Sequence, residues 1–189
     1  MISGLLTLLL LIAPTATEAP DDLDQLLAGL EPGADAQHRL RFTETRDSEL
    51  TDNPLVVTGT LWRDEQGRLV RQTRAPRQAV QRLGERMVVV ERPNRSTRRF
   101  RLERAPELAV IRHALMALLA GDANALRQHF DYELNHSEGG WRLVLTPRER
   151  ALAKKVDSLS LSGHAGRIER FELSLADGTR IATELERHP

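Results

Sequence analysis

One long helical pattern interrupts a chain that otherwise predicts short β-strands, and it limits the available folds. Residues 106–130 (PELAVIRHALMALLAGDANALRQHF) carry branched apolar residues at helical spacing, which makes one continuous stripe. The stripe consists of Leu108, Ile111, Leu115, Leu118 and Leu119. Gly121 suits a left-handed helix end, and Asp122 suits the N-cap of a second, short helix. A helical pair inside a run of strands must cover a sheet face or plug a barrel mouth.

The segments on either side predict about ten strands at the spacing of an antiparallel barrel or sandwich. They span residues 38–46, 55–62, 68–74, 78–83, 86–91, 97–102, 132–134, 141–146, 159–162, 168–175 and 179–185. Gly84-Glu85 and Asp177-Gly178 suit hairpin turns, and Gly59 suits a bulge or bend. Residues 148–155 predict an edge strand or one helical turn, and residues 21–30 a short helix capped by Asp21 or Asp22.

Alternation within these strands predicts one wet and one apolar sheet face. Polar residues such as Arg68, Gln72 and Arg74 fall on one side, which indicates a sheet that meets water on one face only. One large curved sheet, with an apolar concave face and a helical cover, accommodates every predicted element. Such a shape leaves a lipid-sized cavity where the helices do not fill it.

Composition and the first residues limit the class of protein. A chain of 189 residues with formal net charge zero and scattered basic residues fits one domain and disfavours a nucleic-acid binder. Leu5–Ile12 is apolar but too short to span a bilayer, and small residues follow it, as in a secretory signal peptide. We therefore expect residues 1–19 to be a signal peptide, residues 20–189 to form a single domain, and the mature protein to be exported and soluble.

No pattern of catalytic or metal-binding residues stands out. Cysteine is absent and the six histidines lack a zinc-type spacing, so neither a metal nor another cofactor is expected. Ser162-Gly163-His164 lacks the GxSxG context of a hydrolase. His113 lies beside the apolar stripe and is expected at a surface or at the rim of a lid. The arginine-rich residues 95–104 are either a basic docking stripe or, more simply, a solvated strand face.

Several short motifs together resemble the LolA-like family of periplasmic outer-membrane lipoprotein carriers. Phe42-Thr43 lies in one strand and a glycine-x-leucine-tryptophan sequence, Gly59 to Trp62, lies in the next. Leu143 to Pro147 (LVLTP) follows the helical pair, as in the family. The order and spacing agree across most of the mature chain. The family's arginine-proline-asparagine segment is missing, because Arg63 to Gly67 (RDEQG) stands there, and this departure is typical of a divergent relative.

The resemblance implies a mainly β fold with α-helices, an unclosed antiparallel β-barrel of about ten strands under a helical lid. It implies a non-enzymatic periplasmic carrier that moves a lipid or lipoprotein towards the outer membrane. Its partners would be acyl chains, an inner-membrane donor and an outer-membrane acceptor, with no nucleic acid, and the protein would be a monomer. The expected cavity and lid residues are Leu40, Phe42, Leu61, Leu108, Ile111, Leu115, Leu118, Leu119, Leu143 and Leu145. A lipid-sensing module acting on an envelope protein, or an exported lipid enzyme, remains an alternative.

Overall fold

The computed structural model describes residues 22–30, 39–47, 53–137 and 139–187. The predicted signal peptide at residues 1–19 lies outside the described residues, as does the cap candidate Asp21. Among the described residues, no helix combines the length and apolar character that a membrane crossing requires.

Eleven strands of the described chain form one antiparallel sheet, in agreement with the predicted half-barrel of about ten strands. Their order across the sheet is β6-β5-β4-β3-β2-β1-β11-β10-β9-β8-β7, so β6 and β7 are its two edges and the barrel is unclosed. The strands are β1 (Leu40–Asp47), β2 (Leu55–Arg63), β3 (Leu69–Ala75), β4 (Ala79–Leu83), β5 (Met87–Arg92), β6 (Arg95–Arg101), β7 (Phe130–Ser137), β8 (Gly140–Pro147), β9 (Val156–His164), β10 (Arg167–Leu175) and β11 (Arg180–Arg187).

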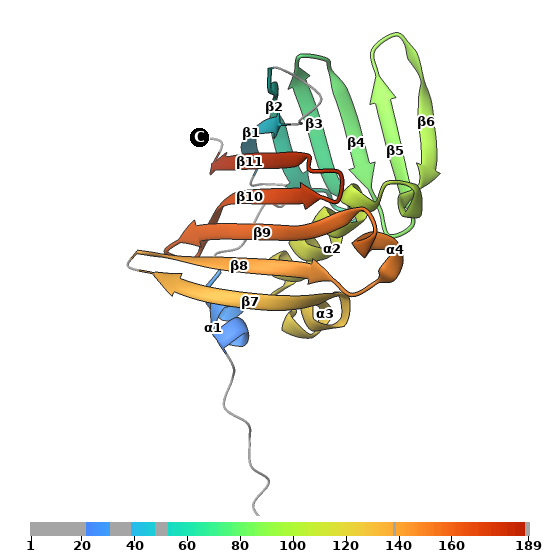
Figure 1. Cartoon of the computed structure of the whole chain (residues 1–189). Coiled ribbons are helices and arrows are strands. Elements are labelled where there is room, and N and C mark those ends of the chain that lie inside the picture. Colours follow the sequence, from blue (N-terminus) through green and yellow to red (C-terminus); the bar gives the residue numbers. More distant parts are fainter. Residues whose placement is uncertain (1–21, 31–38, 48–52, 138, 188–189) are drawn as a thin grey trace, which may run out of the picture.

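The helices lie along one side of this curved sheet (Figure 1). They are α1 (Asp22–Gly29), the 3₁₀ turn η1 (Leu102–Arg104), α2 (Pro106–Ala120), α3 (Ala123–His129) and α4 (Arg150–Ala153). The helix α2 packs against α3, α4, η1 and β9. The mainly β half-barrel with a helical cover is therefore confirmed, and residues 148–155 contain one helical turn rather than an edge strand.

Local signals set the ends of α2 and α3. Pro106 occupies the first turn of α2, where its missing N–H costs no hydrogen bond. Gly121 ends the helix with φ +64°, a conformation that glycine adopts without strain. Asp122 then caps α3, because its Oδ1 accepts a hydrogen bond of 2.9 Å from the Ala125 N–H. Both predicted ends are confirmed.

One predicted turn is displaced by a residue. The N–H of Gly84 donates to the carbonyl of Met87 at 3.0 Å, so Glu85 and Arg86 form the two-residue turn rather than Gly84-Glu85. The register pairs Leu83 with Val88, and both side chains are buried. Burial of this pair on one face decides the register, since a slip of one residue would turn both outward.

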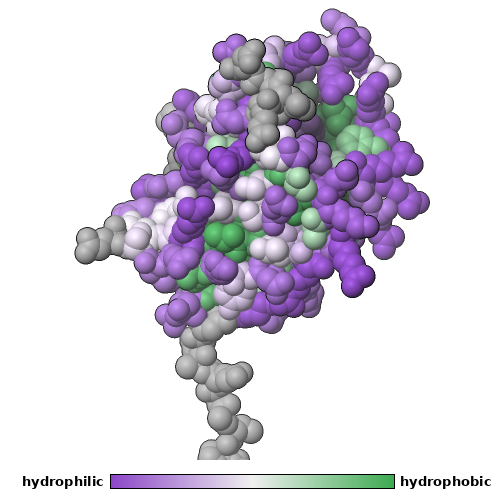
Figure 2. Space-filling view, viewed as in Figure 1, coloured by the Kyte–Doolittle hydropathy of each residue, from purple (hydrophilic) through white to green (hydrophobic). Residues whose placement is uncertain are grey.

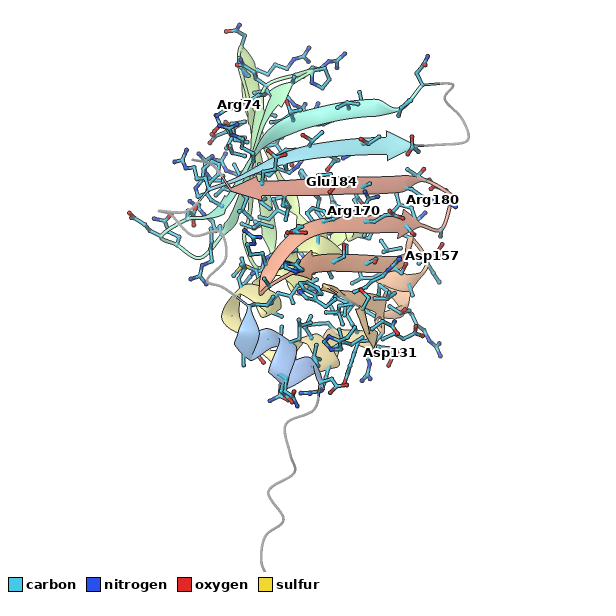
Figure 3. All side chains as sticks on the ribbon, turned by 90° about the vertical axis from the view of Figure 1, so that its left-hand side faces the viewer. Arg74, Asp131, Asp157, Arg170, Arg180 and Glu184 are labelled. Atoms are coloured by element: carbon cyan, nitrogen blue, oxygen red, sulfur yellow. The ribbon has the colours of Figure 1, made fainter. Side chains whose placement is uncertain are left out.

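The two sheet faces differ in chemistry. Figure 3 shows Arg170 and Glu184 on the face turned away from α2, where Arg170 forms ion pairs with both Glu184 and Glu172. The opposite face carries one continuous cluster of buried apolar side chains that includes residues of α1, α2, α3 and most strands. This inner face is therefore the apolar surface of the sheet.

Candidate lipid-binding face

The five predicted wall residues all lie on the inner face, but in two separate places. Leu143 and Leu145 in β8 are fully buried. Phe42 and Leu61 are 3% and 5% exposed, and Leu40, the register partner of Leu61, is half-buried. Four steps across the sheet separate β1 from β8, a distance of about 19 Å along the hydrogen-bonding direction. The wall residues therefore mark two regions of one face rather than one compact pocket.

Gly59 allows close packing in the β1–β2 part of this wall. The register shifts opposite Gly59, but the extra residue is Arg74 in β3, so the predicted bulge lies in the neighbouring strand and not at Gly59. The Phe42 ring lies over the glycine, and a Cβ added at Gly59 would meet ring atoms at 2.7 and 2.8 Å. Alternation along β2 is therefore unbroken, and Leu61 lies on the inner face, as its burial and its pairing with Leu40 require.

The helix α2 buries a different set of residues from the predicted stripe. Leu115 and Leu118 are buried as expected, but the most deeply buried residues of the helix are Val110 and Ala114, both with zero exposure. The other predicted lid residues, Leu108, Ile111 and Leu119, are half-buried beside the core. The reason is that α2 is apolar around most of its circumference. The sheet meets the Val110–Ala114–Leu118 side, and the predicted leucines flank it.

The inner face between β1 and β4 is not purely apolar, which corrects the sequence expectation. Glu44 is 4% exposed and forms ion pairs with Arg71 at 3.0 Å and with Arg46 at 2.9 Å. Thr73 and Thr183 are also buried on this face. Sequence alternation missed the cluster because a charged residue between polar neighbours looks like part of the wet face. The position of Arg71 does indicate a buried polar site, because alternation along β3 places Arg71 on the same face as Leu69 and not with Arg68 or Arg74.

A row of apolar residues crosses the β3–β6 half of the same face. Leu69, Leu83, Val88 and Phe100 are successive cross-strand partners, and only Phe100 is half-buried. The space-filling view shows apolar side chains over the β4–β6 part of the molecule, framed by hydrophilic ones (Figure 2). The Leu102 N–H donates to the Arg86 carbonyl at 2.9 Å, which ties the start of the helical cover to the same end of the sheet. The apolar row therefore lies at the end of the sheet where the helical cover begins.

Two histidines join α2 to the end of α3. The rings of His113 and His129 stack with centroids 4.5 Å apart and planes inclined by 18°. His113 is half-buried, and its Nδ1 has no hydrogen-bond partner. Burial above all, together with the charges of the neighbouring His129 and Arg112, lowers the pKa of His113 from 6.5 to about 4. His113, which was predicted at the rim of a lid, therefore lies in a contact between α2 and the end of α3. This contact requires the neutral imidazole ring.

This contact predicts a loss of stability in acid. Between about pH 6.5 and pH 4 the unfolded chain binds a proton at His113 that the folded chain does not, so stability falls as the pH falls through this window. The melting temperature should therefore drop from pH 7 to pH 5, and His113→Gln should flatten this dependence. The matched control is His136→Gln at an exposed position of β7. An unchanged pH slope in His113→Gln would contradict the assignment.

The other residues considered for catalysis or metal binding lie away from the inner face. Within the described residues, no group of three potential metal ligands occurs. Ser162 lies in β9 and pairs with Arg142 and Arg170, and His164 is exposed at the end of that strand. A recess of about 250 Å³ lies beside α1 and is lined by Asp22, Gln25, Leu26, Gly29, His136 and Gly166. Its mixed lining differs from the apolar surface under α2.

Comparison with known proteins identifies the relationship. The sequence profile of the family described as "Outer membrane lipoprotein carrier protein LolA-like" matches residues 15–185. No curated protein sequence matches the chain. Among solved structures, a LolA superfamily protein from Nitrosomonas europaea has 10% identity and a TM-score of 0.44, with 87% of this chain and 89% of that chain covered.

Two further solved structures show likeness at similar levels. LprF from Mycobacterium bovis has 12% identity and a TM-score of 0.37, with 87% of this chain and 91% of that chain covered. The MucA/MucB complex from Pseudomonas aeruginosa has 18% identity and a TM-score of 0.39, with 89% of this chain and 58% of that chain covered. With such low TM-scores none of these likenesses bears on function, and the family assignment rests on the sequence profile.

Proposed function

This chain belongs to the LolA-like family of outer membrane lipoprotein carrier proteins, and we propose that it is an envelope carrier that holds acyl chains between its sheet and α2. One observation carries the proposal: an apolar row, Leu69 to Phe100, crosses the sheet at the end where the helical cover begins and finishes at a half-buried side chain on the edge strand β6. A carrier makes and breaks no bond, so neither a catalytic residue nor a cofactor is part of the proposal. The proposed site of action is the periplasm, with export directed by residues 1–19.

The energetics of a carrier fit a cover that packs against its own sheet. Burial of an acyl chain is worth roughly 0.8 kcal/mol per methylene, or about 12 kcal/mol for a chain of sixteen carbons. A carrier that gained all of this would not release its cargo. Ligand entry must displace contacts that Leu115 and Leu118 already make with the core, so binding exchanges one set of apolar contacts for another.

Uptake of a fluorescent fatty acid by the delipidated mature protein tests this function. We expect saturable binding, and we expect Phe100→Glu to abolish it, because the new carboxylate would lie on the apolar row beside the chain. Met87→Glu is the matched control: Met87 is 42% exposed and pairs with Arg101 on the opposite face of the same hairpin. Absence of saturable uptake by the unmodified protein, or equal loss in both variants, would refute a site on this face.

A further inference from the structure

Arg71 is a buried cation on the inner face of the sheet. Its side chain is only 16% exposed, and its neighbours in the register are Leu61 on one side and Gln81 on the other. The guanidinium Cζ lies 4.5 Å from the centre of the Phe42 ring, which it covers. Burial lowers the pKa of Arg71, while the nearby Glu44 raises it. An arginine nevertheless stays charged in a protein, so this position carries a permanent positive charge.

The partners of Arg71 do not use its full hydrogen-bonding capacity. Nη1 donates to Thr73 Oγ1 at 3.3 Å and to Gln81 Oε1 at 3.5 Å, both long contacts. Nη2 lies 3.0 Å from Glu44 Oε2 as an ion pair, yet this buried nitrogen makes no hydrogen bond of adequate geometry. A poorly aligned contact leaves part of the donor capacity of this guanidinium unused, and a well-placed ligand oxygen would use it.

The charge around Arg71 is positive. Glu44 is shared, because Arg46 Nε donates to its other oxygen, Oε1, at 2.9 Å. Two cations, Arg46 and Arg71, thus face one carboxylate. In a partly desolvated surface this excess positive charge favours a bound anion.

The positive cluster adjoins the apolar row. Arg71 lies two residues after Leu69 in β3, and its partner Gln81 lies two residues before Leu83 in β4. The Arg71–Gln81 pair is therefore next to the Leu69–Leu83 pair on the same face. The apolar row lies at the α2 end of the sheet, where Leu102 bonds to Arg86, and Arg71 lies on the side farther from the β4–β5 turn. The surface is therefore amphipathic along the strands, apolar beneath the cover and cationic beyond it.

From this arrangement we propose that the cargo is an acyl chain with an anionic head, whose carboxylate or phosphate oxygen accepts from Arg71 while the chain lies along Leu69, Leu83 and Val88. The inference rests on the proposed function and names its ligand class. An ionised oxygen supplies a better-aligned acceptor for the guanidinium and balances the excess charge. A neutral ester or alcohol head supplies neither to the same extent.

Three fluorescent probes with the same acyl chain test the inference: a fatty acid, its methyl ester and phosphatidylglycerol. At about pH 8, where the carboxyl group is ionised, the delipidated protein should bind an anionic probe on the order of tenfold more tightly than the ester. The anionic probe that binds more tightly identifies the head as carboxylate or phosphate. Arg71→Met should remove the preference without removing ester binding, and Arg71→Lys should restore part of it.

Two more variants keep the test decisive if Arg71→Met fails to fold. Glu44→Gln removes the competing carboxylate and should increase the preference for the anion. Arg74→Ala, an exposed arginine of the same strand on the outer face (Figure 3), should leave the preference unchanged. Equal affinity of the unmodified protein for acid, ester and phosphatidylglycerol would overturn the anionic head but not the acyl-chain carrier. Failure of all three probes to bind would overturn the carrier itself.

Discussion

Replacement of Gly59 by alanine should cost at least about 3 kcal/mol of unfolding free energy and loosen the β1–β3 region. The new Cβ would lie 2.0 Å from the backbone carbonyl oxygen of Gln72 and within 2.8 Å of the Phe42 ring. Neither neighbour is a flexible side-chain end. The strands β2 and β3 must separate to relieve the contact with Gln72, and the Phe42 ring must also shift, away from the Arg71 guanidinium that covers it.

Urea unfolding followed by circular dichroism measures this cost. Gly84→Ala is the matched control, because the Cβ added there meets the Met87 carbonyl oxygen at 3.4 Å and the Arg68 Cγ at 4.0 Å, without a clash. The control should unfold close to the unmodified protein, and Gly59→Ala should unfold at a much lower urea concentration. Equal midpoints for the two variants would show that the close packing of Phe42 on Gly59 contributes little.

Replacement of Leu118 by aspartate should detach α2 while the sheet persists, if α2 is a movable lid. Leu118 is 2% exposed and belongs to the core, so an ionised carboxylate there costs several kcal/mol, about 3–5. A lid can avoid this cost by swinging into water. We therefore expect a cooperative strand transition, a reduced helical signal and faster lipid exchange.

Circular dichroism melts and lipid-release rates on the same variant separate a lid from a fixed core element. Ala120→Asp, at an exposed position in the last turn of α2, controls for added charge on the helix. Complete loss of cooperative unfolding in Leu118→Asp would make α2 structural core, and release of cargo would then need another opening.

Much of the fold could be predicted because its signals are local. The ends of α2, the cap at Asp122 and the position of the last hairpin follow from single residues with strong conformational preferences. Gly178, for example, has φ +83° between β10 and β11. The turn at Gly84 was misplaced because burial of Leu83 and Val88 across two strands decides its register, and that signal is not local.

The site could be predicted only in part, because it depends on contacts between distant strands. Apolar positions on alternating strands correctly placed Phe42, Leu61, Leu143 and Leu145 on the buried face. No sequence pattern indicated that Glu44 meets Arg71, since these residues come from strands separated by β2. The buried side of α2 was also not predictable in detail, because a helix that is apolar on most sides does not specify which side meets the sheet.

The central claim is that this protein holds an acyl chain between its sheet and α2. Native mass spectrometry of the protein, purified without detergent from its own source, tests it most directly. We expect a species heavier than the polypeptide by the mass of one acylated molecule, and we expect Phe100→Glu to lack it while Met87→Glu retains it. A polypeptide that carries no lipid in all three preparations, or lipid retained equally by Phe100→Glu, would contradict the account.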